Sequence, residues 1–167
     1  MKSVEWKWGL LIGGAGVAWL VLAWALGLHS RTFGWVWGAA LVSFAISLVG
    51  YVLAMRDLKR HEPEATFAEG VRSAALIAAV SAVVAIGGRV LYLTVLNPGW
   101  TDFVVGEMRR HYEKQGVGGE QLEQIAAGVA QTYGFVPDLI QAGVGAFLTG
   151  VLFSALILGV MRRHSYR

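Results

Sequence analysis

Residues 97–138 read NPGWTDFVVGEMRRHYEKQGVGGEQLEQIAAGVAQTYGFVPD, and this stretch decides how the whole chain is organised. It is the one part of the chain that is neither strongly apolar nor a short charged connector. Three long apolar segments come before it and one follows it. About 20 consecutive apolar residues cross a bilayer core of about 30 Å. The sequence therefore predicts an all-α integral membrane protein of four transmembrane helices, with a two-helix extracytoplasmic insert between helices 3 and 4.

Two amphipathic helices are predicted inside this insert. They cover about residues 101–114 and about residues 120–132, and the glycine-rich run 116–119 separates them. In each segment the apolar side chains recur three or four positions apart, so they share one helix face. These two apolar stripes must be buried on the bundle, on the bilayer or on a partner, and they are the candidate contact surface. They consist of Val104, Met108 and Tyr112 in the first helix and Leu122, Ile125, Val129 and Tyr133 in the second.

The four spans form a single membrane domain, 1–167, around the insert. We expect them at about residues 6–28, 33–55, 71–96 and 138–161, with about 97–137 left for the insert. The charged run 56–64 is expected as a solvated loop, or as a weak contact with anionic head groups. The Thr66…Glu69 pattern predicts a capping box that begins the third helix. Pro98, which has no backbone N–H, predicts its end.

The composition is typical of a protein that has lipid as part of its solvent. The chain of 167 residues is 56% hydrophobic and 15% charged, with a mean hydropathy of +0.55, whereas soluble domains are about 25% charged. Because it has no cysteine, a disulfide framework and thiolate chemistry are excluded. The pI near 9.4 is explained by basic residues that flank membrane spans, so no nucleic-acid partner is expected.

Charge also predicts the orientation in the membrane. The N-terminus, the connector between spans 2 and 3 and the C-terminus are rich in lysine and arginine. The connector between spans 1 and 2 and the insert, counted to Asp138, hold four basic and six acidic residues. Because basic connectors stay in the cytoplasm, both termini are expected there, and the insert is expected on the outer side.

Small residues recur at helix-packing spacing in three of the predicted spans. In lipid, such residues allow two helix backbones to approach closely. The pattern predicts tight packing, but it leaves open whether the packing occurs within one chain or between chains. The helix-packing candidates are Gly9, Gly13, Gly34, Gly38, Ala142, Ala146, Gly150 and Ser154.

Arg89 is the one strongly ionisable residue well inside a predicted span. A charge within the bilayer is costly and raises the hypothesis of a functional polar site. Arg89 lies about seven residues, or roughly 10 Å, from the end of its helix. Its long side chain can therefore snorkel to the interface or make a structural hydrogen bond, and this interpretation is preferred. The alternative is a ligand or ion role near the outer mouth.

Other patterns that carry chemistry are missing from the sequence. The four histidines lie in four separate hydrophilic segments without a second ligand at metal-binding spacing, so no metal is expected. No carboxylate lies in the interior of a predicted span, which removes the usual proton or sodium relay. No nucleophile–base pair or cofactor motif can be assembled. The sequence therefore predicts no catalytic residue, no cofactor and no enzyme, and it leaves a small-molecule ligand open.

Four short motifs are spread over nearly the whole chain. They are Lys7-Trp8-Gly9-Leu10, Thr66-Phe67-Ala68-Glu69-Gly70 after the basic exit of span 2, Tyr92…Asn97-Pro98, and Gly150…Ser154…Arg162-Arg163. In these motifs the chain resembles domain of unknown function family 4199. The resemblance implies an integral four-helix protein of the bacterial inner membrane. It implies no activity and no catalytic residues.

These observations favour a non-enzymatic membrane component, either a homo-oligomer or an accessory subunit of a membrane complex. Its outward insert would be the contact surface, and its expected partners are the lipid bilayer and either a second copy of the chain or another membrane protein. The alternative is a small transporter or channel that uses Arg89 near the outer mouth. An enzyme ranks third.

Overall fold

The computed structural model describes the backbone of residues 3–29 and 33–165 and the side chains of residues 3–29 and 35–161. Within these ranges all regular elements are helices. In chain order they are α1 (Ser3–Ala25), α2 (Phe33–His61), α3 (Phe67–Leu91), the π-helical turn η1 (Tyr92–Leu96), α4 (Trp100–Lys114), α5 (Gly119–Thr132) and α6 (Phe135–Ser165). Helices α1, α2 and α6 and the continuous α3–η1 segment are long and apolar enough to cross a membrane. The chain is therefore a multi-pass membrane protein, as the sequence predicts.

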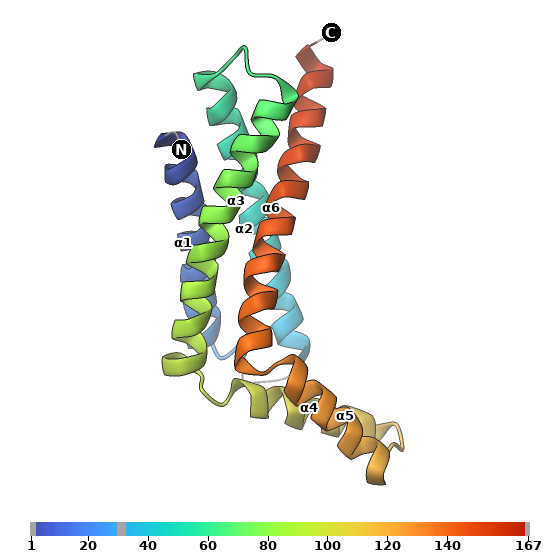
Figure 1. Cartoon of the computed structure of the whole chain (residues 1–167). Coiled ribbons are helices and arrows are strands. Elements are labelled where there is room, and N and C mark those ends of the chain that lie inside the picture. The colour runs from blue at the N-terminus through green and yellow to red at the C-terminus, as the bar shows by residue number, and fades with distance from the viewer. Residues whose placement is uncertain (1–2, 30–32, 166–167) are drawn as a thin grey trace.

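The four long helices form one bundle (Figure 1). Helix α3 packs along both α1 and α6, while α2 packs on α1 and α6 and only touches α3. Helix α1 begins and α6 ends at the same end of the bundle, where the α2–α3 connector also lies, and we call this the terminal end. Helices α4 and α5 lie across the opposite end, which we call the insert end.

Helix α2 runs further toward the terminal end than the sequence predicts. It continues to His61, so most of the charged run 56–64, expected as a loop, is helical. Leu58 is buried in the core, so packing holds the helix beyond its apolar stretch. In addition, Lys59 and Arg60 lie in the last turn, where positive charge offsets the partial negative charge of a helix C-terminus.

Helix α1 ends three residues before the predicted end of the span, in a Schellman motif. The Gly27 N–H donates to the Trp24 carbonyl at 2.8 Å. The Leu28 N–H donates to the Ala23 carbonyl at 3.0 Å. Gly27 has a φ of 70°, a left-handed conformation that glycine adopts without a steric penalty. The turn places His29 at the insert end of the bundle.

The predicted start of the third helix is confirmed, and so is the end of its span. The Thr66 hydroxyl accepts from the Glu69 N–H at 3.3 Å, and the Glu69 carboxylate accepts from the Thr66 N–H at 2.8 Å, which completes the capping box. The span ends at Leu96, but its last turn is π-helical. There the Asn97 N–H donates to the Tyr92 carbonyl, five residues back, at 2.7 Å. Such turns are rare and often mark functional sites.

The two helices predicted for the insert are present, and α4 and α5 match their predicted ends to within one residue. Between them Gly116 (φ 82°) and Gly119 (φ 60°) take a left-handed conformation, which other residues adopt only at a cost. The two helices pack on each other as a hairpin that projects sideways from the insert end (Figure 1). Helix α6 begins at Phe135, before the predicted residue 138, so Asp138 lies in its first turn.

Candidate functional site

Arg89 of α3 is paired with Asp138 of α6 inside the insert end of the bundle. Nη2–H of Arg89 donates to Oδ2 of Asp138 at 2.7 Å, and Nε–H donates to the other carboxylate oxygen. The two side chains are 16% and 7% exposed. A bidentate, charge-assisted pair holds both groups in one geometry. Arg89 therefore reaches across to the neighbouring helix and does not snorkel along its own helix.

Trp100 and Tyr92 complete the surroundings of this ion pair. The Trp100 indole N–H donates to Oδ2 of Asp138 at 3.2 Å, so the carboxylate accepts three hydrogen bonds. The guanidinium carbon of Arg89 lies 4.8 Å from the ring centre of Tyr92 and 5.2 Å from that of Trp100, within the range of cation–π attraction. Buried charges are tolerated when they are paired and hydrogen-bonded, and both conditions are met here.

A chain of hydrogen bonds leads from the start of the insert to His29. The amide N–H of the Asn97 side chain donates to the Tyr92 hydroxyl at 2.8 Å. That hydroxyl lies 2.9 Å from Nδ1 of His29. Because it already accepts from Asn97, we assign its own proton to the bond with Nδ1, which places the proton of the neutral ring on Nε2. Burial, and then the positive charge of Arg89, hold the pKa of His29 below its usual 6.5, so the ring is neutral at neutral pH.

The π-helical turn explains why Tyr92 and Asn97 meet. In an α-helix the side chains three or four positions apart are neighbours, whereas η1 brings residues five apart together. Pro98 then ends the helix, and α4 starts directly afterwards with Trp100. This short segment supplies half of a group that we call the polar cluster. The polar cluster consists of His29, Arg89, Tyr92, Asn97, Trp100 and Asp138.

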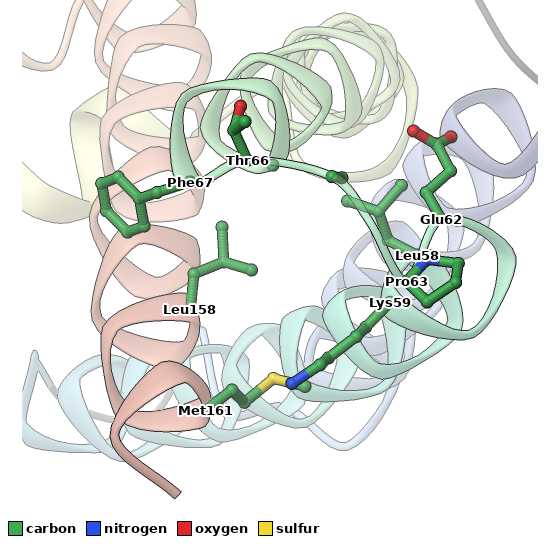
Figure 2. A pocket seen from close by; sticks show the side chains of 10 residues that line it. Leu58, Lys59, Glu62, Pro63, Thr66, Phe67, Leu158 and Met161 are labelled. Carbon is green, nitrogen blue, oxygen red and sulfur yellow. The ribbon is translucent and has the colours of Figure 1, made fainter. Parts of the chain in front are cut away.

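Cavities lie at both ends of the bundle. At the terminal end a cavity of about 70 Å³ lies under the α2–α3 connector, between Leu58 of α2 and Leu158 and Met161 of α6 (Figure 2). At the insert end a cavity of about 190 Å³ borders the polar cluster, and His29 and Arg89 both line it. In the described part of the chain, no three histidine, aspartate or glutamate side chains come together as a possible metal site.

The family comparison agrees with this architecture. A family model described as protein of unknown function, DUF4199, matches residues 7–163. The chain belongs to the DUF4199 family. The family resemblance predicted from the four sequence motifs is thus confirmed. Comparison with curated proteins and with solved structures finds no match. For this DUF4199 protein, a function therefore has to be argued from the polar cluster, the hairpin and the cavities.

Sequence reasoning found only Arg89 of the polar cluster. A last span that starts at residue 138 leaves Asp138 at the membrane surface, so the arginine has no visible counter-charge. The structure starts α6 earlier, so Asp138 lies inside its first turn and is buried at 6% exposure. Charge balance was the available signal, because a buried arginine requires a partner. Asp138, at the start of the predicted fourth span, is the carboxylate nearest to a span on the insert side.

Two of the predicted packing glycines lie between α1 and α3 of the DUF4199 protein. A Cβ atom built on Gly9 would lie 2.5 Å from Cβ of Val80. One built on Gly13 would lie 2.7 Å from Cβ of Val84. Real Cβ atoms do not approach so closely, so these positions let the two helices come together as small residues do in lipid.

The predicted stripe on α6 faces the interior of the bundle. A Cβ on Gly150 would collide with the Tyr51 hydroxyl and with Ala78. Ser154, one turn further on, is fully buried. The other two members of the stripe are half-buried, and they are Ala142 and Ala146. This stripe therefore packs within the chain.

Helix α2 departs from the predicted packing pattern. Gly38 is exposed, with open space around a Cβ built there, so it makes no close contact within the chain. The surroundings of Gly34 lie outside the described residues. Three glycines that the pattern does not single out make close contacts instead, and these contacts are Gly50 on Ile12, Gly88 on Val17 and Gly143 on Ile86. Periodic spacing does not say which helix face turns inward.

The two predicted contact stripes of the hairpin face each other and the bundle. Val104 and Leu122 are buried. The remaining members are half-buried, and they are Met108, Tyr112, Ile125, Val129 and Tyr133. Val129 and Tyr133 pack against the apolar cluster at the insert end, and the Tyr133 carbonyl accepts from the Thr101 hydroxyl at 2.8 Å. The chain itself thus covers most of both stripes, and they are not a free contact surface.

The outer surface of the hairpin is polar and holds its own ion pairs. Arg109 of α4 donates to both carboxylate oxygens of Glu123 of α5, at 2.5 and 2.7 Å. These hydrogen bonds hold the pKa of Glu123 below its usual value. Within α4, Arg110 donates to Glu107. Residues 97–137 carry five acidic and three basic side chains, so the hairpin is net acidic.

A second polar site joins α1 to α2 at the terminal end. The Asp57 carboxylate accepts from the Trp8 indole N–H at 2.7 Å and from the Lys7 ammonium at 3.0 Å. Nδ1 of His61, one turn along α2, lies 3.5 Å from the other oxygen. The Lys7 and His61 side chains are more than half exposed, so water reaches this site.

Proposed function

We propose that this DUF4199 protein is a non-enzymatic accessory subunit of a complex in the bacterial inner membrane, with the α4–α5 hairpin as its contact surface. In this proposal both termini lie in the cytoplasm and the hairpin lies outside, the orientation that the basic connectors favour. The family is described only as one of unknown function, so the support for the proposal comes from the hairpin.

The observation that carries the proposal is the form of the hairpin. Its apolar stripes are largely covered by each other and by the bundle. Its root is held by Trp100, whose indole N–H bonds to the buried Asp138. The hairpin projects sideways beyond the four long helices (Figure 1), so its polar surface is within reach of a neighbouring membrane protein. A preformed surface of this kind loses little conformational entropy on binding.

The charge of the hairpin favours a partner with a basic surface. Two of its three basic side chains already have carboxylate partners inside the hairpin, Arg109 with Glu123 and Arg110 with Glu107. The remaining exposed charge is mainly acidic. Two such hairpins would repel each other, and anionic lipid head groups would repel them as well. A contact with a different membrane protein is thus favoured over a hairpin-to-hairpin dimer.

The transporter alternative requires Arg89 to offer its charge to a solute. In the bundle this charge is balanced by Asp138 through two hydrogen bonds. A solute anion would have to displace a carboxylate that is bound at close range and desolvated. The ion pair therefore favours a structural role for Arg89.

Photocrosslinking of the full chain in its own membrane tests the proposal. A photoreactive residue in place of Gln121, which is exposed on α5, is expected to give one defined crosslinked species. The matched control carries the same residue in place of Leu152, which is 63% exposed in the middle of α6. Mild detergent extraction followed by mass measurement then gives the size of the assembly.

Charge reversal on the hairpin provides the second part of the test. The double variant Glu113→Lys/Glu120→Lys is expected to reduce the crosslinked species at least about tenfold, since close like charges oppose association. Glu64→Lys, exposed at the terminal end, is expected to leave it unchanged. A strict monomer with no crosslink from residue 121 contradicts the proposal. A crosslink between two copies of the chain alone would replace the accessory subunit by a homo-oligomer.

A further inference from the structure

The cavity of about 190 Å³ at the insert end is not used by the proposed contact role. Helices α1 and α2 supply most of its wall, and His29, Arg89 and Trp100 complete it. Its volume is far above the ~10–15 Å³ that a single buried water needs. The wall is otherwise almost entirely apolar and includes Trp19, Leu20, Ala23, Val36 and Ala39. It therefore suits a small apolar group that has one polar end.

Two hydrogen-bond donors of the polar cluster have no acceptor among the described residues. Arg89 directs Nε and Nη2 to Asp138, and among the described residues Nη1 has no acceptor. His29 is only 8% exposed. Its Nδ1 accepts from Tyr92, so its proton is on Nε2, for which the described ranges offer no acceptor either. Because both side chains line the cavity, these donors are available to a ligand that brings an acceptor oxygen.

The charge of the site favours an uncharged acceptor. The charges of Arg89 and Asp138 cancel, and His29 is neutral. An anion would have to compete with Asp138 for the guanidinium of Arg89, and a cation would be repelled by that guanidinium. The ring of Trp19 is held in place because its N–H donates to the Ala39 carbonyl at 2.9 Å. This leaves its apolar surface to the cavity.

We propose that this cavity binds the carbonyl end of an apolar molecule that enters from the bilayer. The carbonyl oxygen accepts hydrogen bonds from Nη1 of Arg89 and Nε2 of His29, and the apolar body packs between α1 and α2 beside Trp19. A quinone ring and the ester group of an acyl lipid both present this chemistry. The proposal does not depend on the hairpin contact.

Two neighbouring residues of α2 provide a matched pair of variants. Ala40 lines the cavity, so Ala40→Phe fills it with a ring. Leu41 is 73% exposed on the outside of the bundle, so Leu41→Phe adds the same ring one position along without entering the cavity. His29→Phe keeps an aromatic side chain and removes the donor. If Ala40→Phe does not fold, His29→Phe is compared with Leu41→Phe in its place.

Two binding measurements on the purified full chain test the proposal and separate the two sources. In the first, decylubiquinone is added in detergent and the melting temperature is followed. In the second, native mass spectrometry counts dioleoyl phosphatidylglycerol molecules retained after extraction. Quinone binding is expected to raise the melting temperature by roughly 2–4 °C in the native chain and in Leu41→Phe. Lipid binding is expected to appear as one retained molecule in the same two proteins.

The cavity variants decide the outcome. Ala40→Phe and His29→Phe are expected to lose whichever signal the native chain gives. If they lose the rise in melting temperature with decylubiquinone, the ligand is a quinone. If they lose the retained phosphatidylglycerol, the ligand is an acyl lipid bound through its ester group. If neither probe binds the native chain, the proposal is overturned. It is also overturned if both cavity variants bind the probes as well as Leu41→Phe does.

Discussion

Each end of the bundle has one carboxylate that accepts from a basic side chain and a tryptophan N–H, but the two sites differ in burial. At the terminal end Asp57 accepts from Lys7 and Trp8. At the insert end Asp138 accepts from Arg89, and also from the tryptophan that begins α4. The Lys7 side chain is 56% exposed, whereas the Arg89 side chain is 16% exposed. The same chemistry is thus solvated at one end and enclosed by protein at the other.

Burial gives the two ion pairs different roles. An exposed pair contributes little to stability, and salt screens it. A buried pair has lost its hydration, so the removal of one partner leaves an uncompensated charge inside the protein. The site at Asp138 therefore specifies how α3, α4 and α6 meet. The site at Asp57 is a surface link between α1 and α2.

The largest expected effect is the loss of one partner of the buried pair. Arg89→Met or Asp138→Leu alone is expected to lower the free energy of unfolding by about 3–5 kcal/mol. The double variant Arg89→Met/Asp138→Leu is expected to recover much of that loss, because two apolar side chains leave no charge unpaired. Melting in detergent measures all three. Arg72→Met, exposed near the start of the same helix, is the control, and a double variant no more stable than the singles contradicts the pairing.

A smaller loss is expected when the hydrogen-bond chain to His29 is broken. Tyr92→Phe removes the hydroxyl that joins Asn97 to the imidazole and leaves both partners unsatisfied. The expected cost is about 1–3 kcal/mol in the free energy of unfolding. Tyr112→Phe, which removes the hydroxyl of a half-buried residue in the hairpin, is expected to change stability much less. Denaturant titration compares the two, and equal losses would show that the hydrogen-bond chain adds nothing specific.

The insert end is also expected to respond to pH through His29. Burial lowers the pKa of His29 in the folded chain below its usual 6.5, so below that pH the unfolded chain binds a proton that the folded chain does not. The free energy of unfolding should therefore fall as the pH drops below the usual pKa and level off at the folded pKa. For one proton the slope is at most about 1.4 kcal/mol per pH unit. Melting from about pH 8 to about pH 5 measures it. In His29→Asn this component should disappear, and an unchanged slope would assign it to another group.

The smallest effect is expected at the terminal end. Asp57→Asn removes the charge partner of Lys7 but keeps an acceptor for Trp8, so the melting temperature should fall only slightly. The difference should vanish near about 1 M salt, where screening acts within about 3 Å. The Arg89→Met loss should persist in the same salt. If salt instead abolishes the loss of melting temperature in Arg89→Met and leaves the loss in Asp57→Asn, the two sites do not differ in burial as we describe.

The elements could be predicted because their signals lie in consecutive residues. The capping box at Thr66 and the glycine break at residues 116–119 are each encoded by a few consecutive residues, and both are present as predicted. The apolar period of the insert predicted α4 and α5 to within one residue. The polar cluster could not be predicted in the same way. His29, Arg89 and Asp138 are far apart in the chain and meet only when three segments reach the same level of the bundle.

The four spans, the two-helix insert between the third and fourth, and the family can all be predicted from the sequence. Which face of each helix turns inward depends on how the helices pack. The tertiary structure buries Gly150 and leaves Gly38 exposed, pairs Arg89 with Asp138, and closes the hairpin stripes on each other. Hydropathy and capping are local properties of the chain, so they can be predicted from neighbouring residues. In lipid, hydropathy does not distinguish an inward face from an outward one, because acyl chains are as apolar as leucine. Close packing and the pairing of buried charges make that choice.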